Sequence, residues 1–145
     1  MRALVIGGSG FIGSYVADRL TAKGFKVTIF DKKRSPWIGK KQKFVKGNIL
    51  NIRDIEKVIS KNDVVFHFAA LADLNEALNK PLDTVRINIL GTANALEASK
   101  KFKIKRFVYA SSIYATSNEG GFYKCSKKAA EDYIEEYQKR YGLNY

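Results

Sequence analysis

The chain has 145 residues, of which 46% are hydrophobic and 28% charged, as in an ordinary soluble globular domain. No apolar run approaches the roughly 18 residues that a membrane-spanning helix needs. The short apolar start of the chain leads directly into glycines, which is not typical of a signal peptide. One cysteine excludes an internal disulfide, and together with one histidine it disfavours a zinc site. We therefore expect one cytoplasmic domain without a membrane partner or a metal.

The net charge of +12 is concentrated in two segments. Residues 32–46 include seven basic and no acidic side chains, and residues 100–106 include five basic ones. Such charge suits a solvated surface, an anionic cofactor with a diphosphate-bearing substrate, or nucleic acid. No recognised nucleic-acid-binding motif accompanies the charge, so nucleic acid is the partner that we favour least.

Short apolar runs alternate with helical patterns along the whole chain. Strands are expected at residues 2–6, 26–30, 43–46, 63–68 and 104–110, and helices at 11–23, 51–60, 81–101 and 122–141. This alternation is typical of parallel βαβ units with helices on both faces of the sheet. It predicts an α/β fold with a doubly wound parallel sheet. In the Rossmann type of this fold, which we expect here, the strand order is 3-2-1-4-5, with a sixth strand to follow.

A glycine-rich turn, Gly7-Gly8-Ser9-Gly10-Phe11-Ile12-Gly13, follows the first predicted strand and opens the first helix. In that context glycines allow a tight turn and the close approach of a pyrophosphate to the free N–H groups of the helix. Asp31 ends the second strand, where a carboxylate binds the adenosine ribose hydroxyls and repels a 2′-phosphate. The two features predict NAD in preference to NADP, although Lys32, Lys33 and Arg34 could accommodate a phosphate.

Tyr123 and Lys127 are four residues apart in the last predicted helix and therefore share one of its faces. A nearby ammonium favours a tyrosinate over the neutral phenol, and a tyrosinate can take a proton from a sugar or alcohol hydroxyl. In a lysine-rich helix the same spacing also arises by chance on a solvated face. The pair alone does not decide between these interpretations.

Together, the glycine turn, Asp31 and the Tyr123/Lys127 pair resemble the extended short-chain dehydrogenase/reductase family. Within it, the chain is most similar to NAD-dependent epimerases and dehydratases that act on nucleotide sugars. The likeness extends through Gly47-Asn48-Ile49, His67-Phe68-Ala69-Ala70, Lys80-Pro81-Leu82, Asn88, Gly91-Thr92 and Ser111-Ser112.

The resemblance implies a role for individual residues. Tyr123 would be the acid/base, Lys127 its partner and a ligand of the nicotinamide ribose, and Ser112 a proton donor or relay with Ser111 as its competitor. Hydride would leave the same sugar carbon for the nicotinamide. The implied cofactor-binding residues are Gly7, Gly10, Phe11, Ile12, Gly13, Asp31, Asn48, Ile49, Phe68, Ala69, Ala70, Asn88, Tyr123 and Lys127.

Three of the matching residues have other interpretations. Asn48 stands where many relatives carry aspartate, and an asparagine can still bond the adenine amino edge. Asn88 would lie near the cofactor, with helix-surface polarity as the alternative. His67, inside a strand, is expected to be a core histidine rather than a catalyst.

Two departures from the family pattern limit the functional prediction. Ile113-Tyr114 follows Ser112 where 4,6-dehydratases typically carry an Asp-Glu pair, so we favour an epimerase over a dehydratase. The segment between Ser112 and Tyr123 is shorter than in the usual epimerases, which leaves the sugar unidentified. An NAD(P)-dependent reductase of another small carbonyl compound and a non-catalytic dinucleotide sensor remain as alternatives.

Residues 143–145 resemble the entry to the sixth strand. We therefore expect residues 1–145 to be the NAD-binding Rossmann domain of a longer enzyme, with its substrate region further along the chain. A nucleotide sugar is the expected substrate, and a homodimer is the expected assembly of the full-length protein.

Overall fold

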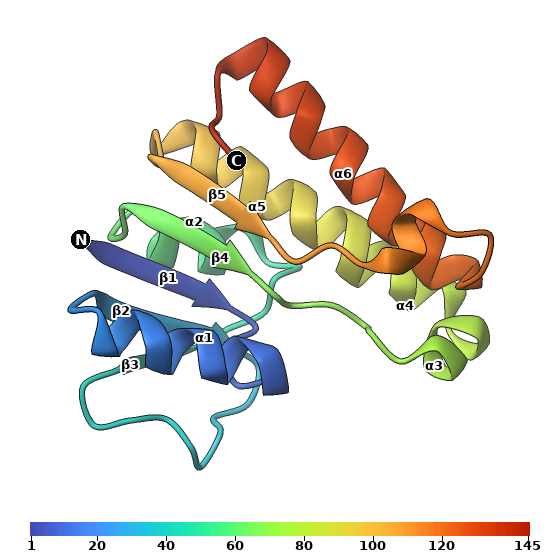
Figure 1. Cartoon of the computed structure of the whole chain (residues 1–145). Coiled ribbons are helices and arrows are strands. Elements are labelled where there is room, and N and C mark those ends of the chain that lie inside the picture. The colour runs from blue at the N-terminus through green and yellow to red at the C-terminus, as the bar shows by residue number, and fades with distance from the viewer.

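A five-stranded parallel sheet forms the centre of the computed structural model, which describes residues 1–145 (Figure 1). The strands are β1 (Arg2–Ile6), β2 (Lys26–Asp31), β3 (Lys43–Lys46), β4 (Val64–His67) and β5 (Arg106–Tyr109). They pair in the order β3-β2-β1-β4-β5, and each pairing is parallel. The order confirms the predicted doubly wound, Rossmann-type sheet.

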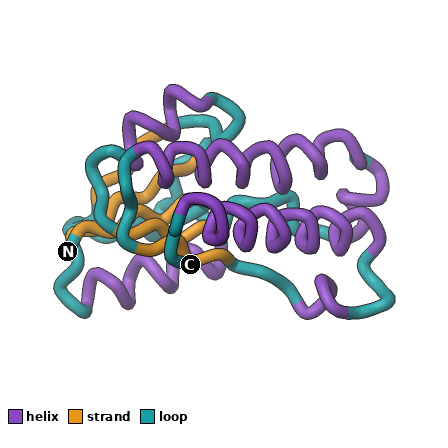
Figure 2. Tube along the Cα trace, turned by 90° about the horizontal axis from the view of Figure 1, so that it is seen from above, coloured by secondary structure: helices purple, strands orange, loops and turns teal.

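Helices cover both faces of this sheet. They are α1 (Phe11–Ala22) on one face and α2 (Ile52–Ile59), α5 (Gly91–Lys101) and α6 (Gly121–Tyr141) on the other. Two short helices, α3 (Leu74–Asn79) and α4 (Pro81–Thr84), pack against α6 beyond the end of the sheet (Figure 1). Successive side chains of a strand point to opposite faces. Accordingly, Leu4 and Ile6 belong to the core beneath α2, α5 and α6, whereas Ala3 and Val5 belong to the core beneath α1. Figure 2 shows α5 and α6 lying side by side.

The helix predicted at residues 81–101 is continuous but not regular. Between α4 and α5 it contains a π-helical turn, η1 (Val85–Leu90). Turns of this kind are rare and occur frequently at functional sites. This one contains Asn88, which is fully buried.

Two short elements were not predicted from the sequence. Helix α3 has six residues, and its N-cap Asp73 accepts a hydrogen bond from the backbone N–H of Glu76. A 3-10 turn, η2 (Ile113–Thr116), follows β5. Both are too short to show a helical period in the sequence.

The residues after α6 return to the edge of the sheet. Leu143 is buried in the larger core, and the Phe107 N–H donates to the Asn144 carbonyl oxygen at 2.8 Å. The segment expected to enter a sixth strand therefore lies beside β5. Among the helices, none combines the length and the apolar character that crossing a membrane would require.

Candidate functional site

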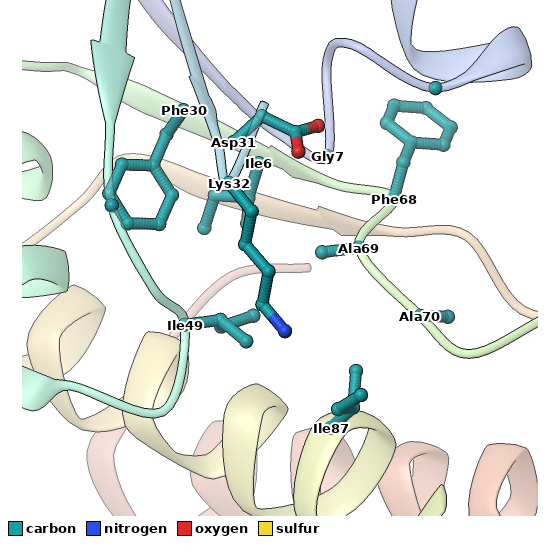
Figure 3. A pocket seen from close by; sticks show the side chains of 12 residues that line it. Ile6, Gly7, Phe30, Asp31, Lys32, Ile49, Phe68, Ala69, Ala70 and Ile87 are labelled. Atoms are coloured by element: carbon teal, nitrogen blue, oxygen red, sulfur yellow. The ribbon is translucent and has the colours of Figure 1, made fainter. Parts of the chain in front are cut away.

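A cleft opens at the carboxyl ends of β1, β2 and β4 (Figure 3). Ligands of open α/β sheets bind at this edge, where the strand order reverses. Seven of the predicted cofactor-binding residues line the cleft: Gly7, Gly10, Asp31, Ile49, Phe68, Ala69 and Ala70. The other lining residues are Ile6, Phe30, Lys32, Gly47 and Ile87.

The glycine turn brings backbone against backbone. Gly7 has a φ of +78°, and a Cβ on it would lie 2.4 Å from the backbone nitrogen of Ala69. A Cβ on Gly13 would lie 2.3 Å from the carbonyl oxygen of Gly7. Neither position has space for a side chain, and the φ of Gly7 also favours glycine. The start of α1 therefore packs directly against the turn.

The N-terminus of α1 presents unpaired donors. Its N-cap, Gly10, has no side chain to accept a hydrogen bond, and the first turn contains no acidic residue. The N–H groups of Phe11, Ile12 and Gly13 have no acceptor within the protein. Such a helix end attracts anions through its N–H groups and its dipole. The turn therefore fits a pyrophosphate, which would meet backbone rather than the exposed Phe11 and Ile12 side chains.

Asp31 joins the glycine turn to the cleft. Its Oδ2 accepts a hydrogen bond from the Ser9 N–H at 3.0 Å, and its Oδ1 accepts one from the Lys33 N–H at 3.4 Å. Figure 3 shows the carboxylate beside Gly7 and the Lys32 side chain extending toward Ile49. The carboxylate therefore holds the turn in place and still borders the cleft.

Tyr123 and Lys127 lie on the buried face of α6, with 9% and 3% of their surfaces exposed. The Lys127 Nζ donates to the Ala110 carbonyl oxygen at 2.8 Å and lies 5.6 Å from the centre of the Tyr123 ring. Burial lowers the pKa of Lys127 to about 8, and the Glu131 carboxylate opposes this fall. The pair is therefore not part of a solvated helix face, the alternative that its spacing had left open.

The two serines after β5 have different surroundings. The Ser111 hydroxyl donates to Glu131 of α6. The Ser112 Oγ accepts from the Tyr114 N–H at 3.3 Å, and its own hydrogen has no acceptor within the protein. Tyr114 packs edge-on against Tyr123, with 6.3 Å between ring centres. Ser112 is therefore the serine whose hydroxyl is free to donate, and Tyr114, two residues further on, contacts Tyr123.

Asn88 connects the segment after β4 to α6. Its Oδ1 accepts from the Leu71 N–H at 2.8 Å, and its Nδ2 donates to the Leu71 carbonyl at 3.1 Å and to the Ser126 Oγ at 2.9 Å. Ser126 in turn donates to the Tyr123 carbonyl at 2.7 Å. Helix-surface polarity is therefore wrong for Asn88. Both amide hydrogens are used within the protein, so its contact with the cofactor stays a prediction without support from these bonds.

Asn48 and His67 also make internal contacts. The Asn48 Oδ1 accepts from the Leu50 N–H at 3.1 Å, and its adenine contact stays a prediction. The His67 Nε2 lies 2.9 Å from the Thr92 Oγ1, and desolvation lowers the pKa of this fully buried histidine to about 3. His67 is therefore a neutral core histidine, as expected.

Ile87 and Tyr109 are among the residues at the site that were not predicted from the sequence. Ile87 lines the cleft from the π turn, whose wider geometry has no signal in the hydrophobic pattern. The ring of Tyr109, the last residue of β5, lies 4.7 Å from the Lys127 Nζ. Its place at the carboxyl end of a strand was the one available signal.

Comparison with known proteins identifies the family that the chain matches. The model of the NAD-dependent epimerase/dehydratase family matches residues 3–145. A Methanocaldococcus jannaschii protein, provisionally named UDP-glucose 4-epimerase, is 34% identical over 98% of this chain and 52% of its own length. The dTDP-D-glucose 4,6-dehydratase of Dictyostelium discoideum is 31% identical over 98% of this chain and 41% of its own length.

A solved structure has the same fold. The UDP-glucose 4-epimerase of Thermus thermophilus in complex with NAD superimposes with a TM-score of 0.90 at 30% identity, over 99% of this chain and 52% of the other. The chain therefore spans between 41% and 52% of the length of these three relatives.

Proposed function

Because this chain belongs to the NAD-dependent epimerase/dehydratase family, we propose that it forms the NAD-binding part of a nucleotide-sugar epimerase or a related oxidoreductase. The observation that carries the proposal is the buried Tyr123/Lys127 pair at the same sheet edge as the cleft. A dinucleotide-binding protein without catalysis has no need for a lysine buried beside a tyrosine. A homodimer and a cytoplasmic location of the full-length protein remain predictions.

The residues of the cleft suit NAD. The N–H groups of Phe11, Ile12 and Gly13 would hold the pyrophosphate, and Asp31 would accept from the ribose hydroxyls. Ile49 would border the adenine half. Bound in this cleft, NAD would supply the acceptor for a hydride from a sugar carbon. The solved relative from Thermus thermophilus contains NAD, which supports this choice of cofactor.

Proton transfer falls to three side chains at the carboxyl end of β5. With a pKa of about 8, Lys127 is mostly protonated at neutral pH, and its positive charge lies 5.6 Å from the ring centre of Tyr123, the proposed tyrosinate. The tyrosinate would take the proton of a sugar hydroxyl, and the free Ser112 hydroxyl would donate to the same oxygen. Lys127 retains further N–H donors for the nicotinamide ribose.

We favour epimerisation over 4,6-dehydration for one reason on this chain. Eliminating water requires an acid and a base beside the sugar, and the positions after Ser112 are occupied by Ile113 and Tyr114, which offer no carboxylate. The relatives include a dehydratase as well as epimerases, so they do not decide between the two reactions.

The first test is cofactor binding by the chain, measured by nicotinamide fluorescence on adding NADH. We expect saturable binding, and no signal at high micromolar NADH would contradict every version of the proposal.

The second test is reduction of the nicotinamide by UDP-sugars in the full-length protein. Tyr123→Phe is expected to lower this rate about 100- to 10,000-fold while NADH still binds, because only the acid/base is removed. Tyr133→Phe, at a half-exposed tyrosine of the same helix, is the matched control. An unchanged rate in Tyr123→Phe would exclude Tyr123 as the acid/base. Activity with another carbonyl compound alone would indicate the reductase, and no turnover the sensor.

A further inference from the structure

The Lys127 ammonium lies over two aromatic rings. Its Nζ is 4.7 Å from the centre of the Tyr109 ring and 5.6 Å from that of Tyr123. The Nζ also donates a hydrogen bond, at 2.8 Å, to the carbonyl oxygen of Ala110, the residue after Tyr109. One strand end therefore supplies both the nearer ring and the carbonyl.

No carboxylate forms an ion pair with Lys127. Glu131 lies one turn further along α6, but it accepts a hydrogen bond from Ser111 and lies 3.9 Å from the Nζ of Lys128. His67, on the adjacent strand β4, is neutral and contributes no negative charge. A buried ammonium without compensation is strongly destabilising, so other groups must stabilise this one. The Ala110 carbonyl and the two ring faces are the groups in contact with it, and the Glu131 carboxylate adds an attraction at longer range.

We propose that Tyr109 is a positioning residue of the Tyr123/Lys127 site, whose ring face holds the Lys127 ammonium beside Tyr123. A cation within about 6 Å of a ring centre is attracted by the negative face of the ring, more strongly where water is excluded. The ring therefore stabilises the charged form of the lysine at the place where Tyr123 needs it. This catalytic role rests on the proposed function of the pair, whereas the contact itself does not.

The hydroxyl of Tyr109 is not what the site uses. It is buried without a hydrogen-bond partner, which costs free energy that a phenylalanine would not incur. The ring also packs against His67, with 5.6 Å between ring centres. Tyr109→Phe therefore keeps the ring face and its packing, and Tyr109→Met removes the ring while it fills the space with an apolar side chain. The two variants separate the ring from the hydroxyl.

The experiment is an NMR titration of the chain labelled with 13C-lysine, without cofactor. Lys127 is assigned by the signal that Lys127→Met removes. We expect its pKa, about 8 in the unaltered chain, to fall by about half a unit to one and a half units in Tyr109→Met and to stay in place in Tyr109→Phe. An unchanged or raised pKa in Tyr109→Met, or an equal fall in Tyr109→Phe, would overturn the proposal.

The chain offers a matched control. The Lys100 Nζ lies 4.6 Å from the centre of the Tyr141 ring, but this lysine is partly exposed and pairs with Glu97 at 2.7 Å. Tyr141→Met removes an equivalent ring and should leave the titration of Lys127 unchanged. A shift of Lys127 in this control would show that the effect of Tyr109→Met is not local.

A further readout needs no substitution. Protons held over a ring face are shifted upfield, so the Lys127 Cε protons of the unaltered chain should resonate upfield of those of exposed lysines, and ordinary shifts would contradict the contact. NADH binding, measured separately, tests the proposed function. The NMR result on Lys127 and the NADH-binding result can each fail without the other.

Discussion

The cofactor cleft and the region around Tyr123 and Lys127 lie at the same edge of the sheet, but different interactions hold them in shape. We call the second region, which includes Asn88 and Ser126, the Tyr123/Lys127 corner. The cleft depends on backbone that leaves no space for side chains, as at Gly7 and Gly13. The corner depends on buried polar side chains that join distant segments, as Asn88 joins Ser126 over 38 positions. The cleft should therefore be sensitive to added volume, and the corner to lost hydrogen bonds.

The corner's dependence on side chains predicts the largest effect on stability. Asn88→Leu leaves the buried Leu71 N–H and carbonyl and the Ser126 hydroxyl without their Asn88 partner. Because each unpaired buried group costs about 1–3 kcal/mol, we expect the free energy of unfolding to fall by about 3 kcal/mol, measured by urea denaturation. Asn94→Leu, which loses a single half-buried bond to the Ile49 carbonyl, should cost about 1 kcal/mol. Equal losses in the two variants would show that the Asn88 hydrogen bonds contribute no more to stability than the single bond of Asn94.

The cleft's dependence on close backbone contact is tested at Gly13. Gly13→Ala places a methyl group 2.3 Å from the Gly7 oxygen, and the backbone must shift to relieve the overlap. We expect a loss of about 2 kcal/mol in thermal or urea unfolding, together with weaker NADH binding. Gly39→Ala is the control, because its Cβ would lie 3.6 Å from the Gln42 side chain, an ordinary contact. If Gly13→Ala left the free energy of unfolding unchanged, the turn would have space for a methyl group.

His67 lies between the two regions and makes their common core dependent on pH. Its folded pKa, about 3, is below the usual value of 6.5, so the unfolded chain binds a proton that the folded chain does not. Stability should therefore fall as the pH decreases from about 6.5 toward 3, by up to about 1.4 kcal/mol per unit. Between about pH 6.5 and pH 5, we expect a loss of up to about 2 kcal/mol in urea unfolding.

The control for the pH dependence follows from composition. His67 is the only histidine, so no other side chain of its type titrates in this range. His67→Gln should flatten the dependence between about pH 6.5 and pH 5, whatever it costs at neutral pH. A variant that keeps the slope of the unaltered chain would place the responsible group elsewhere.

The same contrast explains which features could be predicted from the sequence. The parallel sheet and the glycine turn depend on local patterns, namely apolar strands of four to six residues and glycines at fixed spacing, so they were predicted correctly, and the strand order follows from the Rossmann type that these patterns indicate. The π turn that places Asn88 and Ile87, and the contact of Tyr109 with Lys127, depend on packing between elements that are far apart in the chain. No pattern within one segment reports such contacts, which is why the Tyr123/Lys127 spacing alone left two interpretations open.

The smallest effect is expected at Asp31. This residue lines the cleft, but its side chain also holds the glycine turn through a hydrogen bond. Asp31→Asn keeps an oxygen for the Ser9 N–H, so the turn should hold, but it removes the charge that faces the cleft. We expect NADH to bind about tenfold more weakly and NADPH more tightly, because the repulsion of a 2′-phosphate is lost while Lys32 remains in the cleft. Fluorescence titration with both cofactors measures the ratio. Asp18→Asn, at a carboxylate that bonds Gln42 outside the cleft, should leave that ratio unchanged. If Asp31→Asn also leaves it unchanged, Asp31 acts only to hold the turn and belongs with the glycines, and the choice of cofactor lies elsewhere in the cleft.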